Sequence, residues 1–493
     1  MIIDKSYSLF TKFSFCLAKH KGWFILFGLF TFVLLSLWSV FILQDFPNSA
    51  DEYAYLFQAR TFLKGKLFTT AHPLFQFFDL THVPIKNGKM FSIFPPGWPL
   101  FLTLAMFLKI PTWAVNPALG TLSLIALFLL GRKMFNSKIA ILTVFFVFLS
   151  PFFLFNAASY FSHTFCSLLI ILVAYFMLKN LSSGKKIYLF LSGLLWGIAL
   201  ITRYYTAVLC LLPLLIYWFV NQKKGHKNLI WFLLGTTPAI LFFALYNYQI
   251  TGNPFLPTFT WVYPEIRPIF FSPIFSLEQA FHFTADHFIR FFLWTPSSFI
   301  FIFLFFLFFP LSKLKKIGFL ELIPLFLGLG YFFYYCRGGN QYGPRFYYEG
   351  FPFLVLFITS QLFKDKFYWQ KKRASRIMYW LLLIGLVFNL PLLLYHAHIE
   401  HQVIYERKDL FRQVETKNIK NAIIFIRTDT GTLRPMYYRD LLRNNLDFSN
   451  DVFYALDLGT IENDKLRQYY PDKDCFTYSF DKSSNMGYLS PQR

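Results

Sequence analysis

The sequence predicts an all-α protein that crosses a membrane about eleven times and ends in a small α/β domain. Three observations predict this fold class. Apolar residues make up 56% of the 493 residues and charged residues only 15%, whereas soluble domains carry roughly 25% charged residues. The apolar residues fall in long uncharged runs. Basic residues fall in short clusters between those runs, as in the cytoplasmic loops of membrane proteins.

The first apolar run, Trp23–Leu43, contains 21 residues without a charge. A helix of about 20 residues spans the hydrocarbon core of a bilayer. The run is too long for a removable signal peptide and lacks a small-residue cleavage site. We therefore expect a retained first span.

The basic clusters predict the topology. After the first span they lie near 132–138, 179–186, 223–227, 313–316 and 364–376. Two spans fit between each consecutive pair, so every cluster is expected in the cytoplasm, with the N-terminus inside and the C-terminal domain outside a bacterial inner (plasma) membrane. The expected spans are 23–43, 113–131, 139–156, 164–179, 187–201, 205–220, 229–248, 297–311, 318–335, 350–363 and 377–395.

Residues 44–112 are expected to form one large outer loop with two helices at the membrane surface. The segment Gly97–Leu108 follows a Pro-Pro pair and is only twelve residues long, too short to cross the bilayer. The segment Asp51–Arg60 has apolar residues at helical spacing, with Asn48 or Ser49 as its N-cap.

The C-terminal segment is polar and mixed in charge. It contains two strand-like runs, Ala422–Ile426 and Val452–Leu456, among helical stretches. We therefore predict two domains: a transmembrane domain over 1–395, which includes the loop 44–112, and a small extracytoplasmic α/β domain over 396–493.

The formal net charge of +22 does not indicate a nucleic-acid partner. A nucleic-acid-binding domain would present a contiguous basic face, whereas these charges follow the loops between spans. The five cysteines show no CxxC spacing and predict neither a zinc site nor a disulfide framework.

Asp51 and Glu52 are adjacent carboxylates in a chain with few acidic residues. A partly desolvated carboxylate at a membrane surface has a raised proton affinity and is suited to act as a general base. The alternative is that both residues stabilise the first turn of a surface helix. The local sequence leaves both interpretations open.

Arg203 and Arg345 lie outside the cytoplasmic clusters, at the expected outer ends of spans. A guanidinium there is well shaped to bind a phosphate or diphosphate. The alternative is an ordinary interfacial arginine that extends to water or lipid headgroups. Gly338, Gly339 and Gly343 near the second arginine allow close approach of a ligand or simply form a turn.

Histidines on the outer side are weaker candidates. His163 follows the third span, and a single histidine there could contact substrate, bind metal or have no role. In the first loop, His72, Asp79 and His82 match no standard metal-ligand spacing. The span interiors contain almost no ionisable residues, which disfavours an ion-coupled transporter.

Together these features resemble the GT-C class of membrane glycosyltransferases, especially the glycosyltransferase family 39 branch with its protein O-mannosyltransferases and bacterial aminoarabinose transferases. The resemblance covers residues 45–220 well and 342–352 moderately, and does not explain the tail. The stretches that carry it are Asp51–Tyr53, Phe94–Leu100, Asn116–Gly120, Gly131–Phe135 and Ser150–Pro151.

The resemblance implies a GT-C-like fold and a polyprenyl-phosphate sugar donor that enters from the bilayer. The loop carboxylate would activate an acceptor hydroxyl, which displaces the lipid phosphate with inversion. Asp51 matches that carboxylate, and Glu52 is its neighbour or substitute. Arg203 and Arg345 would then bind the donor phosphate. Further candidate substrate contacts are Tyr53, His163 and Tyr342.

The sequence departs from the family in one turn. Many relatives carry an acidic residue after the third span, where this chain reads Tyr160–Thr164. Metal-using members recruit carboxylates there, so no cofactor is implied with certainty and a divalent metal is left open.

We therefore expect an enzyme that transfers a monosaccharide to an envelope glycan, lipid or protein acceptor, with membrane lipids around it and no nucleic-acid partner. The alternatives are a transporter or flippase of lipid-linked saccharides, or a non-catalytic envelope assembly protein.

Overall fold

The computed structural model describes residues 21–222, 226–266, 274–309, 318–335, 338–363, 372–427, 439–481, 483–484 and 486–492. The chain divides into two compact units. Unit 1 comprises 1–39, 113–245 and 263–396, and unit 2 comprises 40–112, 246–262 and 397–493. Basic clusters predicted at 223–224, 313–316 and 364–371 lie outside the described residues.

Unit 1 is helical. Most of its helices are apolar, as expected for segments that satisfy their backbone hydrogen bonds in lipid. The helices are α2 (Lys21–Leu37), which continues into the π-helix η1 (Trp38–Ile42), α5 (Val115–Met134), α6 (Ser137–Phe148), α7 (Pro151–Ala158), α8 (His163–Ser183), α9 (Lys186–Leu200), α10 (Tyr204–Asn221), α11 (Leu229–Thr251), α13 (Leu277–Trp294), α14 (Pro296–Phe308), α15 (Phe319–Phe332), the 3-10 helix η7 (Arg345–Gly350), α16 (Phe351–Phe363) and α17 (Lys372–Arg407). The ends of η1, α11 and α17, from residues 40, 246 and 397 onward, belong to unit 2.

Each of the eleven predicted spans overlaps one of these helices or, for 139–156, the pair α6 and α7. Among the described residues, six helices are long and apolar enough to cross a membrane, or seven if α6 and α7, bent by 71°, form one broken span. The others are shorter, so the membrane character is clear and the number eleven stays a prediction. The helix at the last predicted span, α17, continues beyond residue 395 to Arg407.

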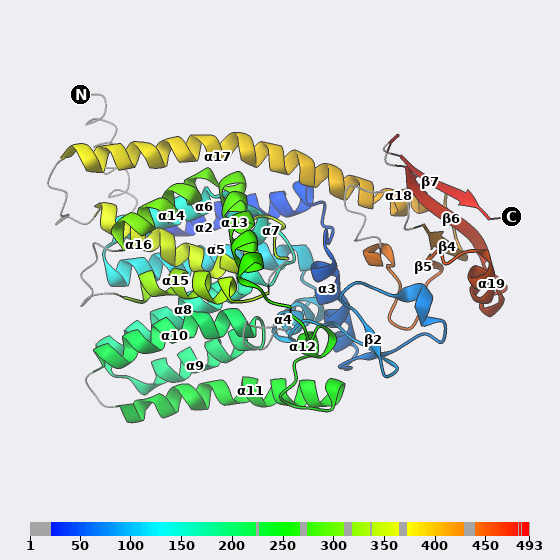
Figure 1. The fold of residues 1–493 in the computed structure, drawn as a ribbon, viewed down its shortest axis with the longest axis horizontal. Helices are drawn as coiled ribbons and strands as arrows, with labels where there is room; N and C mark the ends of the chain where they lie inside the picture. Colours follow the sequence, from blue (N-terminus) through cyan, green and yellow to red (C-terminus); the bar gives the residue numbers. More distant parts are fainter. Residues whose placement is uncertain are drawn as a thin grey trace. The chain divides into compact units, whose positions relative to one another are not determined.

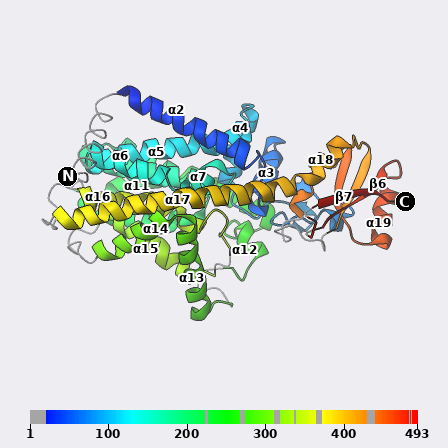
Figure 2. The same cartoon turned by 90° about the horizontal axis from the view of Figure 1, so that it is seen from above.

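Small residues allow the helices of unit 1 to approach closely. Gly193 of α9 faces the carbonyl oxygen of Phe232 in α11, and a Cβ at this position would overlap it. The Thr236 hydroxyl donates to the Gly193 carbonyl at 3.0 Å. Such contacts are typical of membrane helices, where lipid offers no hydrophobic driving force for association. Figure 1 shows α8 to α11 beside one another, and Figure 2 shows α2 along α5.

Unit 2 contains the first loop and the tail. Its helices are α3 (Ala50–Leu63), α4 (Gly97–Phe107), α12 (Thr258–Val262), α18 (Asp409–Thr416) and α19 (Thr460–Tyr469), with the 3-10 helix η2 (Phe75–Phe78). The two helices predicted in the loop are thus present as α3 and α4. The loop also forms a small antiparallel sheet of β1 (Thr69–Thr70), β3 (Lys89–Met90) and β2 (Ile85–Lys86).

The tail forms a four-stranded sheet in the order β5-β4-β6-β7 (Figure 1). The predicted strands are present with the predicted bounds, as β4 (Ala422–Ile426) and β5 (Val452–Leu456). Two further strands, β6 (Asp474–Asp481) and β7 (Met486–Pro491), complete it. Strands β5, β4 and β6 are parallel, and β7 is antiparallel to β6.

The central strand β4 is buried on both faces because it is apolar at every position. Ile424 and Ile426 pack into one hydrophobic cluster with α3 and with loop residues such as Val83. Ile423 and Phe425 point to the other face and pack against Phe77 and Phe78 of η2. The first loop therefore contributes to the core around the tail sheet. The division of the chain into domains over 1–395 and 396–493 stays a prediction.

Candidate active-site residues

The start of α3 gives its two adjacent carboxylates different environments. Ser49 is the N-cap, and its hydroxyl accepts from the backbone N–H of Glu52 at 3.2 Å. Glu52 Oε2 in turn accepts from the Asn48 N–H at 2.8 Å and the Ser49 hydroxyl at 3.2 Å. This reciprocal arrangement is a capping box, and Glu52 is 1% exposed. The Glu52 carboxylate therefore helps to hold the start of the helix.

Asp51 is the more accessible of the two acids. Its side chain is 24% exposed, and its Oδ1 lies 3.4 Å from Nε2 of His82, which is 26% exposed. His82 adopts a left-handed backbone conformation with φ of 64°, unusual for a residue other than glycine. Its ring packs edge-on against Phe94, 5.5 Å between centroids. The turn therefore holds the imidazole beside the Asp51 carboxylate.

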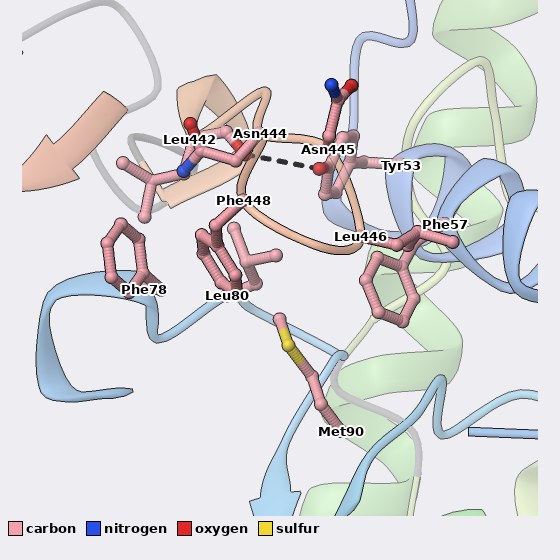
Figure 3. Close-up of a pocket in the computed structure, with 10 residues that line it drawn as sticks. All are labelled: Tyr53, Phe57, Phe78, Leu80, Met90, Leu442, Asn444, Asn445, Leu446 and Phe448. Carbon is pink, nitrogen blue, oxygen red and sulfur yellow. Dashed lines mark hydrogen bonds between the residues drawn. The ribbon is translucent and has the colours of Figure 1, made fainter. Parts of the chain in front are cut away.

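Tyr53, a predicted substrate contact, lies in the core of unit 2. Its side chain is buried, and its hydroxyl donates to the backbone carbonyl of Leu442 at 3.1 Å. Figure 3 shows this bond at the edge of a small cavity that is lined mainly by apolar side chains from α3, the first loop and residues 442–448. Burial raises the pKa of the Tyr53 phenol, so it stays protonated. Its part in substrate binding remains a prediction.

Unit 1 brings Arg203 and His163 to a shared carboxylate, that of Glu349. Arg203 precedes α10, and its Nε lies 3.1 Å from Glu349 Oε1. His163 begins α8, and its Nδ1 lies 3.3 Å from the same oxygen. Glu349 itself lies in η7 and is completely buried. Three separate elements therefore place one cation and one imidazole around a buried acid.

Arg345, at the start of η7, is held by the turn before it. Its N–H donates to the Gly339 carbonyl at 2.9 Å. Gly339 and Gly343 have positive φ angles of 79° and 95°. Side chains at these positions would also collide with Phe346 and Phe152, so both glycines are needed for the turn itself.

The Arg345 guanidinium stacks on an aromatic ring. Its Cζ lies 3.5 Å from the ring centroid of Phe161, within the range of cation–π attraction. Phe161 also contacts the rings of His163 and Tyr342, at 6.1 and 5.7 Å. Arg345 is buried, as is Tyr342. The predicted residues Arg203, Arg345, His163 and Tyr342 thus gather with Glu349 in unit 1.

The buried acid responds to two opposing influences. Burial raises the pKa of Glu349 to about 7, while the adjacent Arg203 guanidinium acts to lower it. A carboxyl with a pKa near neutrality changes charge over the physiological range. The net positive charge of this group of residues therefore depends on whether Glu349 is protonated.

The other two candidate residues of the first loop, His72 and Asp79, make contacts of their own. The His72 ring bonds the Tyr470 hydroxyl at 2.9 Å and packs among aromatic rings. Asp79 forms an exposed ion pair with Arg439 at 2.6 Å. Among the described residues, no group of three or more His, Cys, Asp or Glu side chains has a geometry that could hold a metal ion.

One feature of these sites was not predicted from sequence, and another was left open between two interpretations. Nothing local marks Glu349, whose partners lie far away along the chain. The role of Glu52 had a local indication, because Ser49-Ala50-Asp51-Glu52 follows the Ser-x-x-Glu pattern of a capping box.

Known proteins show the same fold. Residues 95–246 match a family model described as dolichyl-phosphate-mannose-protein mannosyltransferase. The chain is similar to the structure of ArnT from Cupriavidus metallidurans bound to undecaprenyl phosphate, with a TM-score of 0.55, 11% identity and coverage of 94% of each chain. The apo state of the same ArnT gives a TM-score of 0.54 and 12% identity over 94% of this chain and 93% of that one.

A weaker likeness, with a TM-score of 0.46 and 11% identity, is to the archaeal oligosaccharyltransferase AglB from Archaeoglobus fulgidus in complex with an inhibitory peptide and a dolichol-phosphate, over 92% of this chain and 69% of that one. No curated protein sequence matches the chain. The family match and the ArnT structures confirm the resemblance that the sequence carries: this chain is a membrane protein with the fold of the GT-C glycosyltransferases.

Proposed function

We propose that the protein transfers a monosaccharide from a polyprenyl-phosphate donor to an envelope glycan, lipid or protein acceptor at the outer face of a bacterial inner membrane. The observation that carries this proposal is the likeness over 94% of both chains to a protein whose structure contains undecaprenyl phosphate. The family match over residues 95–246, to mannosyltransferases that use a dolichyl-phosphate sugar, agrees with it.

In this proposal the residues of unit 1 bind the donor phosphate. Arg345 and Arg203 supply guanidinium groups, which suit phosphate because they donate several hydrogen bonds in one plane. Stacking on Phe161 fixes the plane of Arg345, and Glu349 holds Arg203 by their ion pair. His163 and Tyr342 are the neighbouring groups that would contact the sugar or the phosphate.

Asp51 of unit 2 is the proposed general base. Its carboxylate is partly exposed and lies beside His82, whereas the Glu52 carboxylate is buried and engaged in the helix cap. A carboxylate that must accept a proton from an acceptor hydroxyl has to be reachable. This difference supports Asp51 as the proposed base and a structural role for Glu52.

The proposed reaction is a single inverting displacement. The acceptor oxygen attacks the anomeric carbon and gives its proton to Asp51. The bond from the anomeric carbon to the phosphate oxygen breaks, and its electron pair leaves with the polyprenyl phosphate. The two arginines stabilise the charge that develops on the departing phosphate oxygen. The products are the glycosylated acceptor and polyprenyl phosphate.

The test uses the full chain purified in detergent with a panel of polyprenyl-phosphate sugars and candidate acceptors. Wild type is expected to release polyprenyl phosphate, and Asp51→Asn to release almost none. Asp79→Asn, which removes an exposed carboxylate of the same loop, is the matched control and is expected to behave as wild type. Absence of release with every donor, or full activity of Asp51→Asn, would overturn the proposal. Movement of intact donor across vesicles without release would instead indicate a flippase.

A further inference from the structure

The tail of unit 2 is joined to the loop that carries Asp51 in two different ways. One is apolar: Ile424, Ile426, Leu410 and Tyr478 share a hydrophobic cluster with Tyr53 and other loop residues. The other is a group of buried polar and charged side chains around residue 48. The apolar core already attaches the tail, so the polar group calls for its own explanation.

Asn48 is the centre of the polar group. It immediately precedes the N-cap of α3 and is fully buried. Its side-chain amide donates to Glu400 Oε2 at 2.8 Å. Its carbonyl oxygen accepts from Arg407 Nη1 at 2.7 Å, and the same nitrogen lies 3.3 Å from Asn48 Oδ1. The last turns of α17 therefore hold both the side chain and the backbone of Asn48.

Arg407 connects this contact to the tail. Its Nη2 donates to Asp440 Oδ2 at 3.1 Å, and both side chains are buried. Nearby, Arg443 lies over the rings of Phe46 and Tyr53, with its Cζ 4.6 Å from each centroid. The segment 439–443 and the end of α17 thus contact residues on both sides of Asn48 and Asp51.

Two physical considerations suggest that this network serves position rather than attachment. Burying an ion pair contributes little to stability compared with apolar packing, and such pairs are better suited to fixing a unique arrangement. The bonds also converge on the turn just before Asp51, which is the second residue of α3. The electrostatic influence of Asp51 reaches the network, because it helps burial to raise the pKa of Asp440.

We propose that Arg407 is a positioning residue for Asp51, and that Glu400, Arg407 and Asp440 form a clamp that fixes the start of α3 through Asn48. This inference rests on the proposed function, because it takes Asp51 to be the general base. In this proposal the C-terminal segment supports the position of Asp51 and is not a separate binding module. Arg407 acts through Asn48 and does not touch substrate.

The test compares Arg407→Met with Arg427→Met in the full-length protein. Arg427 is the matched control, because it forms an ion pair of the same 3.1 Å length with Asp457 in the same tail but is exposed. Arg407→Met is expected to lower kcat about 10- to 100-fold, in line with the cost of a small misplacement of a catalytic group, with little change in donor KM. Arg407→Lys should recover part of the loss. Arg427→Met should leave both parameters unchanged.

Amide hydrogen exchange separates positioning from general destabilisation. Arg407→Met is expected to accelerate exchange in residues 46–56 while β4 and β5 keep wild-type protection. The proposal would be overturned if amide exchange in β4 and β5 rose as much as in residues 46–56. It would also be overturned if the kcat of Arg407→Met were no lower than that of Arg427→Met.

A second variant covers the case in which Arg407→Met does not fold. Asp440→Asn preserves side-chain volume and removes one charge, and it is expected to give a smaller effect of the same kind. Wild-type exchange in residues 46–56 of Asp440→Asn would then contradict the clamp. Exchange is measured without substrate, so the clamp is tested even if wild type transfers no sugar and the proposed function fails.

Discussion

The charged residues of unit 1 and those at the start of α3 in unit 2 show two ways of placing charge in an apolar protein. In unit 1, Arg203 and His163 surround a carboxylate that is completely buried. At the start of α3 one carboxylate is buried in a helix cap and its neighbour remains partly exposed. In the first arrangement the charges are fixed by burial, and in the second the buried Glu52 supports the helix while Asp51 stays accessible.

The difference follows from the cost of burying charge. An arginine in a low-dielectric interior needs a counter-ion, and Glu349 supplies one for Arg203. A general base cannot be neutralised in this way, because it must take a proton from a substrate that reaches it. The comparison therefore predicts that variants at Asp51 affect kcat, that variants of the arginines affect donor binding, and that Glu52 affects stability.

The largest expected effect is at Asp51. Asp51→Asn keeps the size of the side chain and removes the proton acceptor, so kcat should fall by about 10²- to 10⁴-fold. Steady-state release of polyprenyl phosphate measures this loss, and the melting temperature should stay at the wild-type value. A fall in kcat of less than about threefold would contradict the proposal that Asp51 is the general base.

Arg345→Gln is expected to have the next largest effect. A charge-assisted hydrogen bond to phosphate contributes about 1.5–3 kcal/mol, so kcat/KM for the donor should fall about 10- to 100-fold. Arg290→Gln in the same unit is the control, since Arg290 is paired with Asp286 at a half-exposed position. Equal effects of the two variants on donor KM would show that Arg345 has no special role in binding.

The Glu349 carboxyl predicts a pH dependence of donor binding. Its pKa of about 7 means that it becomes ionised as pH rises through 7, which lowers the net positive charge near both arginines. Donor KM should therefore rise, by about fivefold for roughly 1 kcal/mol of lost attraction, between pH 6 and pH 8.

Glu349→Gln provides the check on that sign. The variant cannot ionise, so its donor KM should be constant over the same interval. A sugar phosphodiester donor keeps one negative charge between pH 6 and pH 8. A change in donor KM over this interval therefore reports a change of charge in the protein and not in the donor. A wild-type KM that falls with rising pH would contradict the assignment.

The smallest effect is expected for Glu52→Gln. The amide retains one acceptor oxygen for the Asn48 N–H, so the free energy of unfolding should fall by only about 1 kcal/mol and kcat by less than about threefold. Glu462→Gln, an exposed first-turn acid of α19, should change neither quantity. A loss of activity comparable to that of Asp51→Asn would remove the distinction between the two carboxylates.

Features that depend on local sequence could be predicted. Strands β4 and β5 are short uninterrupted apolar runs, and helix α3 of the first loop begins with a Ser N-cap that the sequence indicates. Strands β6 and β7 escaped prediction because their apolar residues, such as Tyr478 and Leu489, are mixed with polar ones, and because β7 is mostly exposed.

Features that depend on tertiary packing could not be predicted. Arg203 and Arg345 were identifiable because they break the charge pattern of the loops. Glu349 was not, since its role arises from partners on α8 and before α10 that only the fold brings close. The contact of His82 with Asp51 likewise depends on how the first loop turns back on α3.

The bonds between Asn48 and Arg407 join residues separated by 359 positions in the sequence. During synthesis Asn48 is made long before its partner Arg407 and before Asp440, to which Arg407 also bonds. Contacts of such long range form only after the intervening chain has been made. The contacts at the start of α3 therefore cannot all form before Arg407 and Asp440 have been made. A chain truncated before β4 would still contain every predicted span and every proposed catalytic residue, yet it would lack the tail sheet and Asp440. The proposed clamp therefore predicts that such a truncated chain lacks the final geometry at Asp51, although its predicted spans are all present.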